Sequence, residues 1–117
     1  MPVVTIEALP QDPQRVEAML AGVVAAVVDA LSTVPENVWA HFVPMQAVYE
    51  QGRLNDSQGY HPIVTVLANP RPDAVVARGL EAVAAAVVRE LGCPADKVWV
   101  HWVDLPPGRV FSAGQVR

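Results

Sequence analysis

The sequence predicts an α+β fold in which a strand–helix–strand unit occurs twice, giving a four-stranded sheet with two helices on one face. The main observation is an internal repeat with a spacing of 60 residues. Pro2–Ile6 (PVVTI) recurs as Pro62–Val66 (PIVTV), and Val38–Val43 (VWAHFV) recurs as Val98–Val103 (VWVHWV). The two copies align with each other without an insertion, which indicates one structural unit used twice.

Each repeat is expected to begin with a strand and to continue into a long helix. Residues 3–9 are rich in Val, Thr and Ile, which favours a strand, and Pro10 ends it. Asp12 and Pro13 then predict an N-cap followed by proline at the first helical position. Apolar residues recur at spacings of three and four, which predicts one buried stripe on each helix. The stripes are Val16, Leu20, Val23, Val27 and Leu31 in the first helix, and Val76, Leu80, Val83, Val87 and Leu91 in the second.

The second helix is expected to begin at Pro72 and Asp73 and to end at Gly92, a residue suited to a helix C-terminus. Strands follow the two helices at about residues 38–43 and 98–103. A strand, a helix and a parallel strand form a right-handed crossover unit. Two such units predict both helices on the same face of one sheet.

The other face of this sheet is expected to be bare. Side chains alternate between the two faces of a strand, so one face carries Trp39, His41 and Val43 together with Trp99, His101 and Val103. Neither face is fully polar, and a sheet that is apolar on both faces needs cover on both. Since the helices cover only one face, the pattern predicts an oligomer in which another subunit covers the second.

Composition limits the class of protein. The 117 residues suit one domain, over 1–117, with repeats at about 2–60 and 62–117. Apolar residues make up 52%, but no uninterrupted apolar run of about 20 residues predicts a membrane span. The net charge of −4 argues against nucleic acid and anionic membranes as partners. A lone Cys93 and the absence of a signal peptide favour the cytoplasm.

The segments outside the repeated elements predict turns. Gln51-Gly52-Arg53 and the polar residues 55–59 have the composition of a turn or hairpin. The tail from Pro106 predicts a turn followed by a short extended piece. Ferredoxin-like domains also contain two strand–helix–strand units, but a nucleic-acid-binding version would need basic and aromatic surface that this sequence lacks.

With these motifs together, the sequence resembles the tautomerase superfamily. Val38–Gln46 (VWAHFVPMQ) is similar to the matching part of macrophage migration inhibitory factor. Leu67–Arg71 (LANPR) resembles a turn of malonate semialdehyde decarboxylase, and Val98–Pro106 (VWVHWVDLP) resembles the last strand of that enzyme and of the cis-3-chloroacrylic acid dehalogenases. The resemblance spans nearly the whole chain. It implies a homotrimer without cofactor or metal, with the active site around a terminal proline at a subunit boundary.

Pro2 is the residue on which this chemistry would depend. Once Met1 is removed, its nitrogen is a secondary amine, and in the neutral form it can take a proton from a carbon beside a carbonyl. Burial and a nearby cation lower the pKa of an amine, which favours the neutral form. The alternatives are a protonated Pro2 that acts as an acid, and a Pro2 that merely begins an edge strand. A retained Met1 would acylate Pro2 and abolish its basicity.

Arg71 is the next candidate, as a clamp for a substrate carboxylate. An arginine fork binds a carboxylate through two hydrogen bonds. The resemblance implies that Arg71 matches one of two arginines that the decarboxylase-like and dehalogenase-like enzymes use for this purpose. Asn69 stands at the partner position, so the pair is reduced to one cation. The alternative for Arg71 is a solvated surface position.

Trp99 and His101 complete the candidate substrate-binding residues. In the migration inhibitory factor branch, the matching positions hold a tyrosine and an asparagine that reach the proline of a neighbouring subunit. A tryptophan with a histidine above it could bind and polarise an enol-forming acid; the alternative is a histidine bonded to backbone at an interface. Trp39 and His41 are the first-repeat copies, and we expect them to border a non-functional site at Pro62.

No branch of the superfamily has its full residue set here. The positions that match functional residues of other branches hold Asp12, Thr33, Val38, Trp39, His101 and Ser112. Cys93 and His61 have no partner at a spacing that suits metal binding or nucleophilic work, and Asp104 suits a turn cap. Three hypotheses follow: a tautomerase that uses Pro2 as base on a small 2-keto or enol acid, a decarboxylase or hydratase-like dehalogenase that uses protonated Pro2, and a non-catalytic trimer.

Overall fold

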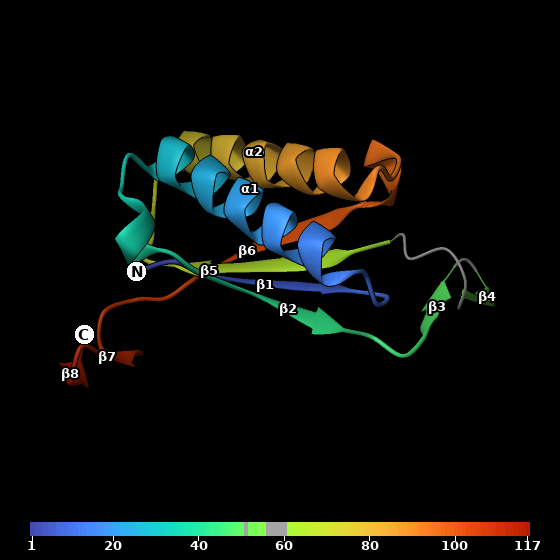
Figure 1. The fold of residues 1–117 in the computed structure, drawn as a ribbon. Coiled ribbons are helices and arrows are strands. Elements are labelled where there is room, and N and C mark those ends of the chain that lie inside the picture. Colours follow the sequence, from blue (N-terminus) through green and yellow to red (C-terminus); the bar gives the residue numbers. More distant parts are fainter. Residues whose placement is uncertain (51, 56–60) are drawn as a thin grey trace.

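The computed structural model describes residues 1–50, 52–55 and 61–117, and its centre is a four-stranded sheet in the order β2-β1-β5-β6. The strands are β1 (Val3–Ala8), β2 (Trp39–Pro44), β5 (Ile63–Ala68) and β6 (Trp99–Asp104). Two helices, α1 (Pro13–Leu31) and α2 (Asp73–Leu91), lie side by side on one face of the sheet (Figure 1). The α+β class, the repeated strand–helix–strand unit and the placement of both helices are therefore confirmed.

The sheet is built from two equivalent halves. β1 pairs with β2 and β5 pairs with β6, both in parallel, whereas β1 and β5 pair antiparallel at the centre. In that central pair Thr5 lies opposite Thr65, its own repeat copy. An approximate twofold axis therefore passes between these two threonines and relates the repeats. Each end of the sheet carries one strand-leading proline, Pro2 at one end and Pro62 at the other.

The helix ends follow the predicted signals. Asp12 caps α1, because its carboxylate accepts a hydrogen bond from the Arg15 backbone N–H at 2.9 Å, and Pro13 is the first helical residue. Gly92 ends α2 in the left-handed region with φ of 67°, as a C-terminal glycine permits. Ser32 takes the same conformation after α1, with φ of 52°, at a cost that glycine would avoid.

The core lies between the helices and the sheet, but the predicted helix stripes are only partly right. The buried side of α1 consists of Met19, Val23, Val27 and Ala30, and that of α2 of Gly79, Val83, Ala86, Val87 and Leu91. Val16, Leu20 and Leu31 are only half-buried, because they lie at the margin of the helix–sheet contact. Each helix packs against both the sheet and the other helix, so its buried face is wider than one stripe and is rotated toward its neighbour.

The connections form short helices and hairpins. Single 3₁₀ turns, Pro35–Asn37 and Ala95–Lys97, lead into β2 and β6. The predicted hairpin between the repeats is confirmed at β3 (Val48–Glu50) and β4 (Arg53–Asn55), while Gln51 and residues 56–59 of the predicted turn segments lie outside the described residues. The tail forms a second hairpin, β7 (Phe111–Ser112) and β8 (Gln115–Val116), rather than a single extended piece.

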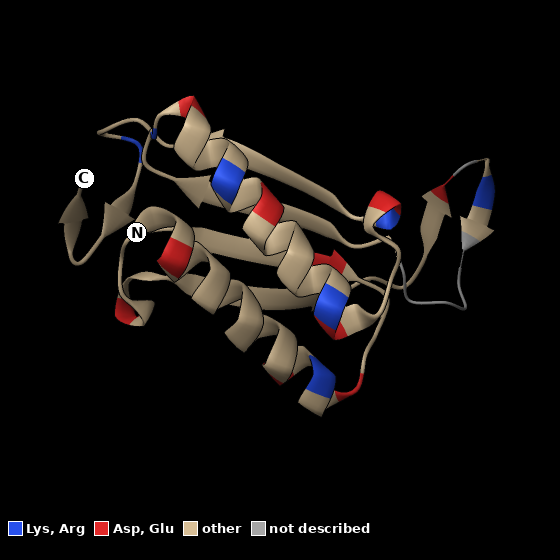
Figure 2. Ribbon diagram, turned by 90° about the horizontal axis from the view of Figure 1, so that it is seen from above, with Lys and Arg blue, Asp and Glu red and all other residues tan. Residues whose placement is uncertain are grey.

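The sheet face away from the helices is bare and largely apolar. It exposes Trp39, Val43, Ile63, Trp99 and Val103. Across its middle runs one polar row, in which His41 bonds Thr5 at 3.2 Å and His101 bonds Thr65 at 3.3 Å. Charged residues lie mainly on the helices and connections rather than on the four strands (Figure 2). No helix among the described residues is long and apolar enough to cross a bilayer.

Candidate active site at the Pro2 end of the sheet

Pro2 is buried where β1 begins. Its carbonyl accepts a hydrogen bond of 3.0 Å from the Trp39 backbone N–H, which continues the β1–β2 ladder by one residue. Met1 precedes it and is 45% exposed. The ring of Pro2 is therefore fixed by the sheet, while the residue on its nitrogen extends toward solvent. A proline nitrogen in this position would be held rigidly by the sheet and, without Met1, could still contact a ligand.

Arg71 and Asn69 lie at the same end of the sheet. Val3 lies opposite Leu67, so Pro2 lies level with Ala68, and the turn that contains Asn69 and Arg71 follows directly. The Arg71 guanidinium donates through Nη1 to the Asn69 carbonyl at 3.2 Å. One of its five N–H donors is used in this bond, which orients a half-exposed guanidinium beside the start of β1.

Trp99 and His101 do not join Pro2 within one chain. Trp99 lies opposite Ile63, and its backbone N–H donates to the Pro62 carbonyl at 3.0 Å, so it marks the far end of the sheet. The Trp99 indole donates through Nε1 to His101 Nδ1 at 3.0 Å. Since the indole N–H can only donate, Nδ1 of His101 accepts and Nε2 carries the proton toward the Thr65 hydroxyl. This pair is thus preorganised, yet it could reach only the Pro2 of another chain.

Trp39 and His41 likewise do not border Pro62 within one chain. The parallel pairing of β1 with β2 aligns Trp39 with Val3, next to Pro2, so they could reach only the Pro62 of another chain. The repeat predicted a correspondence between Trp39 and Trp99. It did not show that each tryptophan borders the proline of its own repeat, because that follows only from the register of the parallel strands.

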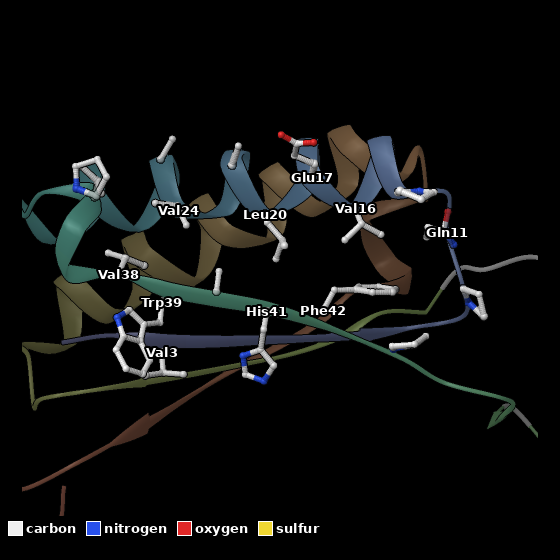
Figure 3. Close-up of a pocket in the computed structure, with 18 residues that line it drawn as sticks. Val3, Gln11, Val16, Glu17, Leu20, Val24, Val38, Trp39, His41 and Phe42 are labelled. Carbon is white, nitrogen blue, oxygen red and sulfur yellow. The ribbon is translucent and has the colours of Figure 1, made fainter. Parts of the chain in front are cut away.

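A long apolar groove, of about 1450 Å³, follows the outer edge of β2 on the side of α1. Val16, Leu20 and Val24 point into it from the helix, and Phe42 lies beside them (Figure 3). The corresponding space beside α2 is occupied by Trp102, whose ring would lie 2.8 Å from a Cβ at Gly79. The groove has no titratable cluster and does not include Pro2, so it is better suited to contact than to chemistry.

The structure brings together two titratable residues that the sequence patterns did not indicate. His61 Nδ1 contacts Glu50 Oε2 at the Pro62 end of the sheet. The predicted hairpin was the available signal, because a hairpin brings its two flanks together. Cys93 is buried, and burial raises the pKa of its thiol, as expected of a structural cysteine. Among the described residues, no three potential ligands gather into a metal site.

Comparisons with known proteins place the chain by fold. No family model and no curated protein matches the sequence. Among solved structures, a fused 4-OT in an asymmetric trimer is 19% identical with a TM-score of 0.89, covering 97% of this chain and 94% of that one. A macrophage migration inhibitory factor from Toxoplasma gondii is 17% identical, with a TM-score of 0.78 and coverage of 98% and 99%. Malonate semialdehyde decarboxylase is 19% identical, with a TM-score of 0.75 and coverage of 98% and 92%.

The chain therefore has the same fold as these tautomerase-like structures, and the fold that the resemblance implied is confirmed. At identities below 20% the likeness extends to the fold alone. The activity has to be argued from the residues.

Proposed function

We propose that the protein is a tautomerase in which Pro2, freed by removal of Met1, acts as general base on a small 2-keto or enol carboxylic acid. The observation that carries the proposal is the position of Pro2, buried at the head of β1 and beside the turn that holds Arg71. A neutral amine takes the proton from the carbon beside the carbonyl and returns it to another atom of the resulting enolate. Arg71 binds the carboxylate and fixes the acid for this transfer.

The cation also favours the form of Pro2 that the reaction needs. A guanidinium near an amine disfavours the ammonium, and burial acts in the same direction. A base of this kind contributes about 10²–10⁴-fold to the rate. The resemblance implies that the catalytic aspartate of the decarboxylase falls on Val38, and that the glutamate and tyrosine of the dehalogenase fall near Ser112 and His101. The tautomerase is therefore favoured over an enzyme that depends on protonated Pro2.

The experiment compares the two strand-leading prolines. Protein whose intact mass shows that Met1 is absent should convert phenylpyruvate between its keto and enol forms, and Pro2→Ala should reduce this rate by at least tenfold. Pro62→Ala is the matched control, because Pro62 begins the equivalent strand but its nitrogen is an amide. Equal losses in both variants, or a loss below tenfold in Pro2→Ala, would contradict a chemical role.

We further propose a homotrimer in which Trp99 and His101 of one subunit approach Pro2 of the next. The bare sheet face exposes two tryptophans, 61% and 64% accessible at Trp39 and Trp99, and these need cover. The hairpin residues Tyr49 and Phe111 are also strongly exposed, at 74% and 72%. A fused 4-OT with the same fold forms a trimer.

A charge placed on the bare sheet face tests the association directly. Val43 lies on that face and is 38% exposed, so Val43→Glu would place a carboxylate against a neighbouring subunit, and an unpaired buried charge is costly. Sedimentation should show a trimer for the unmodified protein and single chains for Val43→Glu at micromolar concentration. Ala77→Glu, at an exposed site on α2, is the control and should stay trimeric. A monomeric unmodified protein would overturn the shared site.

A further inference from the structure

The Pro62 end of the sheet contains a second pocket with its own titratable residues. Its volume is about 380 Å³, within the range of small-ligand sites. Residues from three places in the chain line it: Glu50 of β3, His61 and Pro62 ahead of β5, and Lys97 with Trp99 around the start of β6. Within one chain, β1 and β5 begin at opposite ends of the sheet (Figure 1), so this pocket is separate from Pro2 of the same chain.

The pair of His61 and Glu50 is held in one orientation. The side chains are only 19% and 18% exposed. A carboxylate only accepts hydrogen bonds, so the imidazole donates through Nδ1 and its basic lone pair is on Nε2. His61 also has a φ of 64°, a left-handed conformation that is uncommon for residues other than glycine, asparagine and aspartate. This backbone places the imidazole at the head of β5.

The internal repeat relates the position of His61 to the N-terminus of the chain. His61 is the counterpart of Met1, just as Pro62 is the counterpart of Pro2. At the first site, removal of one residue exposes an amine. At the second, the proline nitrogen is an amide and has no basicity, but the preceding residue supplies an imidazole that lines the same pocket as Pro62. A base is therefore available at both ends of the sheet, from different chemical groups.

The second pocket also has a cation and an apolar wall. Lys97 lines it from the 3₁₀ turn before β6, with the carboxylate of Asp96 beside it, and Trp99 and Tyr49 supply aromatic surface. Asn37 is the counterpart of Lys97 at the Pro2 end, where Arg71 provides the cation instead. Each end thus has one base and one cation for a carboxylate.

We propose that this pocket is a second acid–base site, in which His61 enolises a small 2-keto acid whose carboxylate is bound by Lys97. Nε2 takes a proton from the carbon beside the ketone, and the electron pair of the C–H bond forms the enolate. The imidazolium then returns the proton to the enolate oxygen or carbon, so no oxidant or second reactant is needed. Glu50 is a positioning residue that fixes the tautomer and stabilises the imidazolium.

The test first removes the contribution of Pro2. A short N-terminal extension keeps the Pro2 nitrogen as an amide, and proton NMR in deuterated buffer follows exchange at the methyl group of pyruvate. The extended protein should exchange these protons faster than buffer, and His61→Asn, which tolerates the left-handed backbone, should lower the catalysed rate by about 10²-fold or more. Lys97→Met should raise KM about tenfold with a smaller change in kcat. Glu81→Gln on the outer face of α2 is the control and should leave the rate unchanged.

Two further measurements separate chemistry from structure. His61→Gly leaves room for an added imidazole, and imidazole in solution should restore exchange to this variant more than to His61→Asn. Glu50→Asp should restore part of the kcat that Glu50→Gln loses. Exchange by the extended protein at the buffer rate, or an unchanged rate in folded His61→Asn, would overturn the second site. Neither result bears on Pro2, whose activity is measured in the protein with a free N-terminus.

Discussion

The shared site can be tested by mixing two inactive forms of the protein. Form one carries an N-terminal extension that acylates Pro2 but keeps Trp99 and His101. Form two has a free Pro2 but carries Trp99→Ala and His101→Ala. Within one chain these residues lie at opposite ends of the sheet, so neither form has a complete site when it assembles alone. A mixed ring contains contacts in which Pro2 of one form meets Trp99 and His101 of the other.

The expected recovery follows from the geometry. In a ring with head-to-tail contacts each site combines one subunit with its next neighbour. With random assembly from equal amounts, half of the subunits supply a free Pro2 and half of their neighbours supply the intact strand β6. About one quarter of the sites should therefore be active. The parent form that lacks the base should instead be slower than the unmodified protein by about 10²–10⁴-fold.

The assay is the keto–enol conversion of phenylpyruvate after the two forms are unfolded together and refolded. Native mass spectrometry must show that mixed oligomers are present, and the rate is compared with the sum of the two parents. Recovery of about one quarter of the rate of the unmodified protein supports a site shared between subunits. A rate no higher than that sum, with mixed oligomers present, would refute it, since all catalytic groups would then have to come from one chain.

Two other substitutions test the anion clamp and the packing. Arg71→Ala should raise KM for a carboxylate substrate about 10- to 100-fold, since a charge-assisted hydrogen bond contributes about 1.5–3 kcal/mol; an unchanged KM would make Arg71 a solvated surface residue. Gly79→Ala should lower the free energy of unfolding by about 1–3 kcal/mol, measured by urea, because its Cβ would lie 2.8 Å from the Trp102 ring. Gly22→Ala is the control, since its Cβ would meet only flexible side-chain atoms, of Arg89 at 3.2 Å and of Glu90 at 3.7 Å, and the helix should gain up to about 1 kcal/mol. Similar effects at both glycines would argue against the close packing of Trp102.

Most of the fold could be predicted from the sequence because the signals are local and occur twice. Asp12 with Pro13 marks a helix start through one hydrogen bond and one fixed dihedral, and Gly92 marks an end through its left-handed backbone. Such signals do not depend on the rest of the molecule. The neighbours of Pro2 could be predicted for a similar reason. Antiparallel pairing of the two equivalent strands brings the end of β5 to the start of β1.

The remaining features depend on long-range geometry. The buried sides of the helices could not be read from spacing alone, because each helix packs against both the sheet and its neighbour. The position of Trp39 depends on strand register. The pairing of His61 with Glu50 depends on how the hairpin between the repeats folds back, which residue spacing alone does not give. Hence the sequence pointed to Pro2, Arg71 and Trp99, and it did not point to His61, Glu50 or Lys97.

The differences between the repeats also bear on how subunits would associate. Met19 on α1 corresponds to Gly79 on α2, and Phe42 on β2 corresponds to Trp102 on β6. The small residue on α2 lets the indole pack closely, whereas the α1 side has a groove along the edge of β2. The two edges of the sheet are therefore unlike in shape, although they derive from the same unit. Contact between two like edges would give a twofold dimer, whereas contact between unlike edges repeats head to tail and closes into a ring. The divergence of the repeats thus favours the association that would bring Trp99 of one subunit to Pro2 of the next.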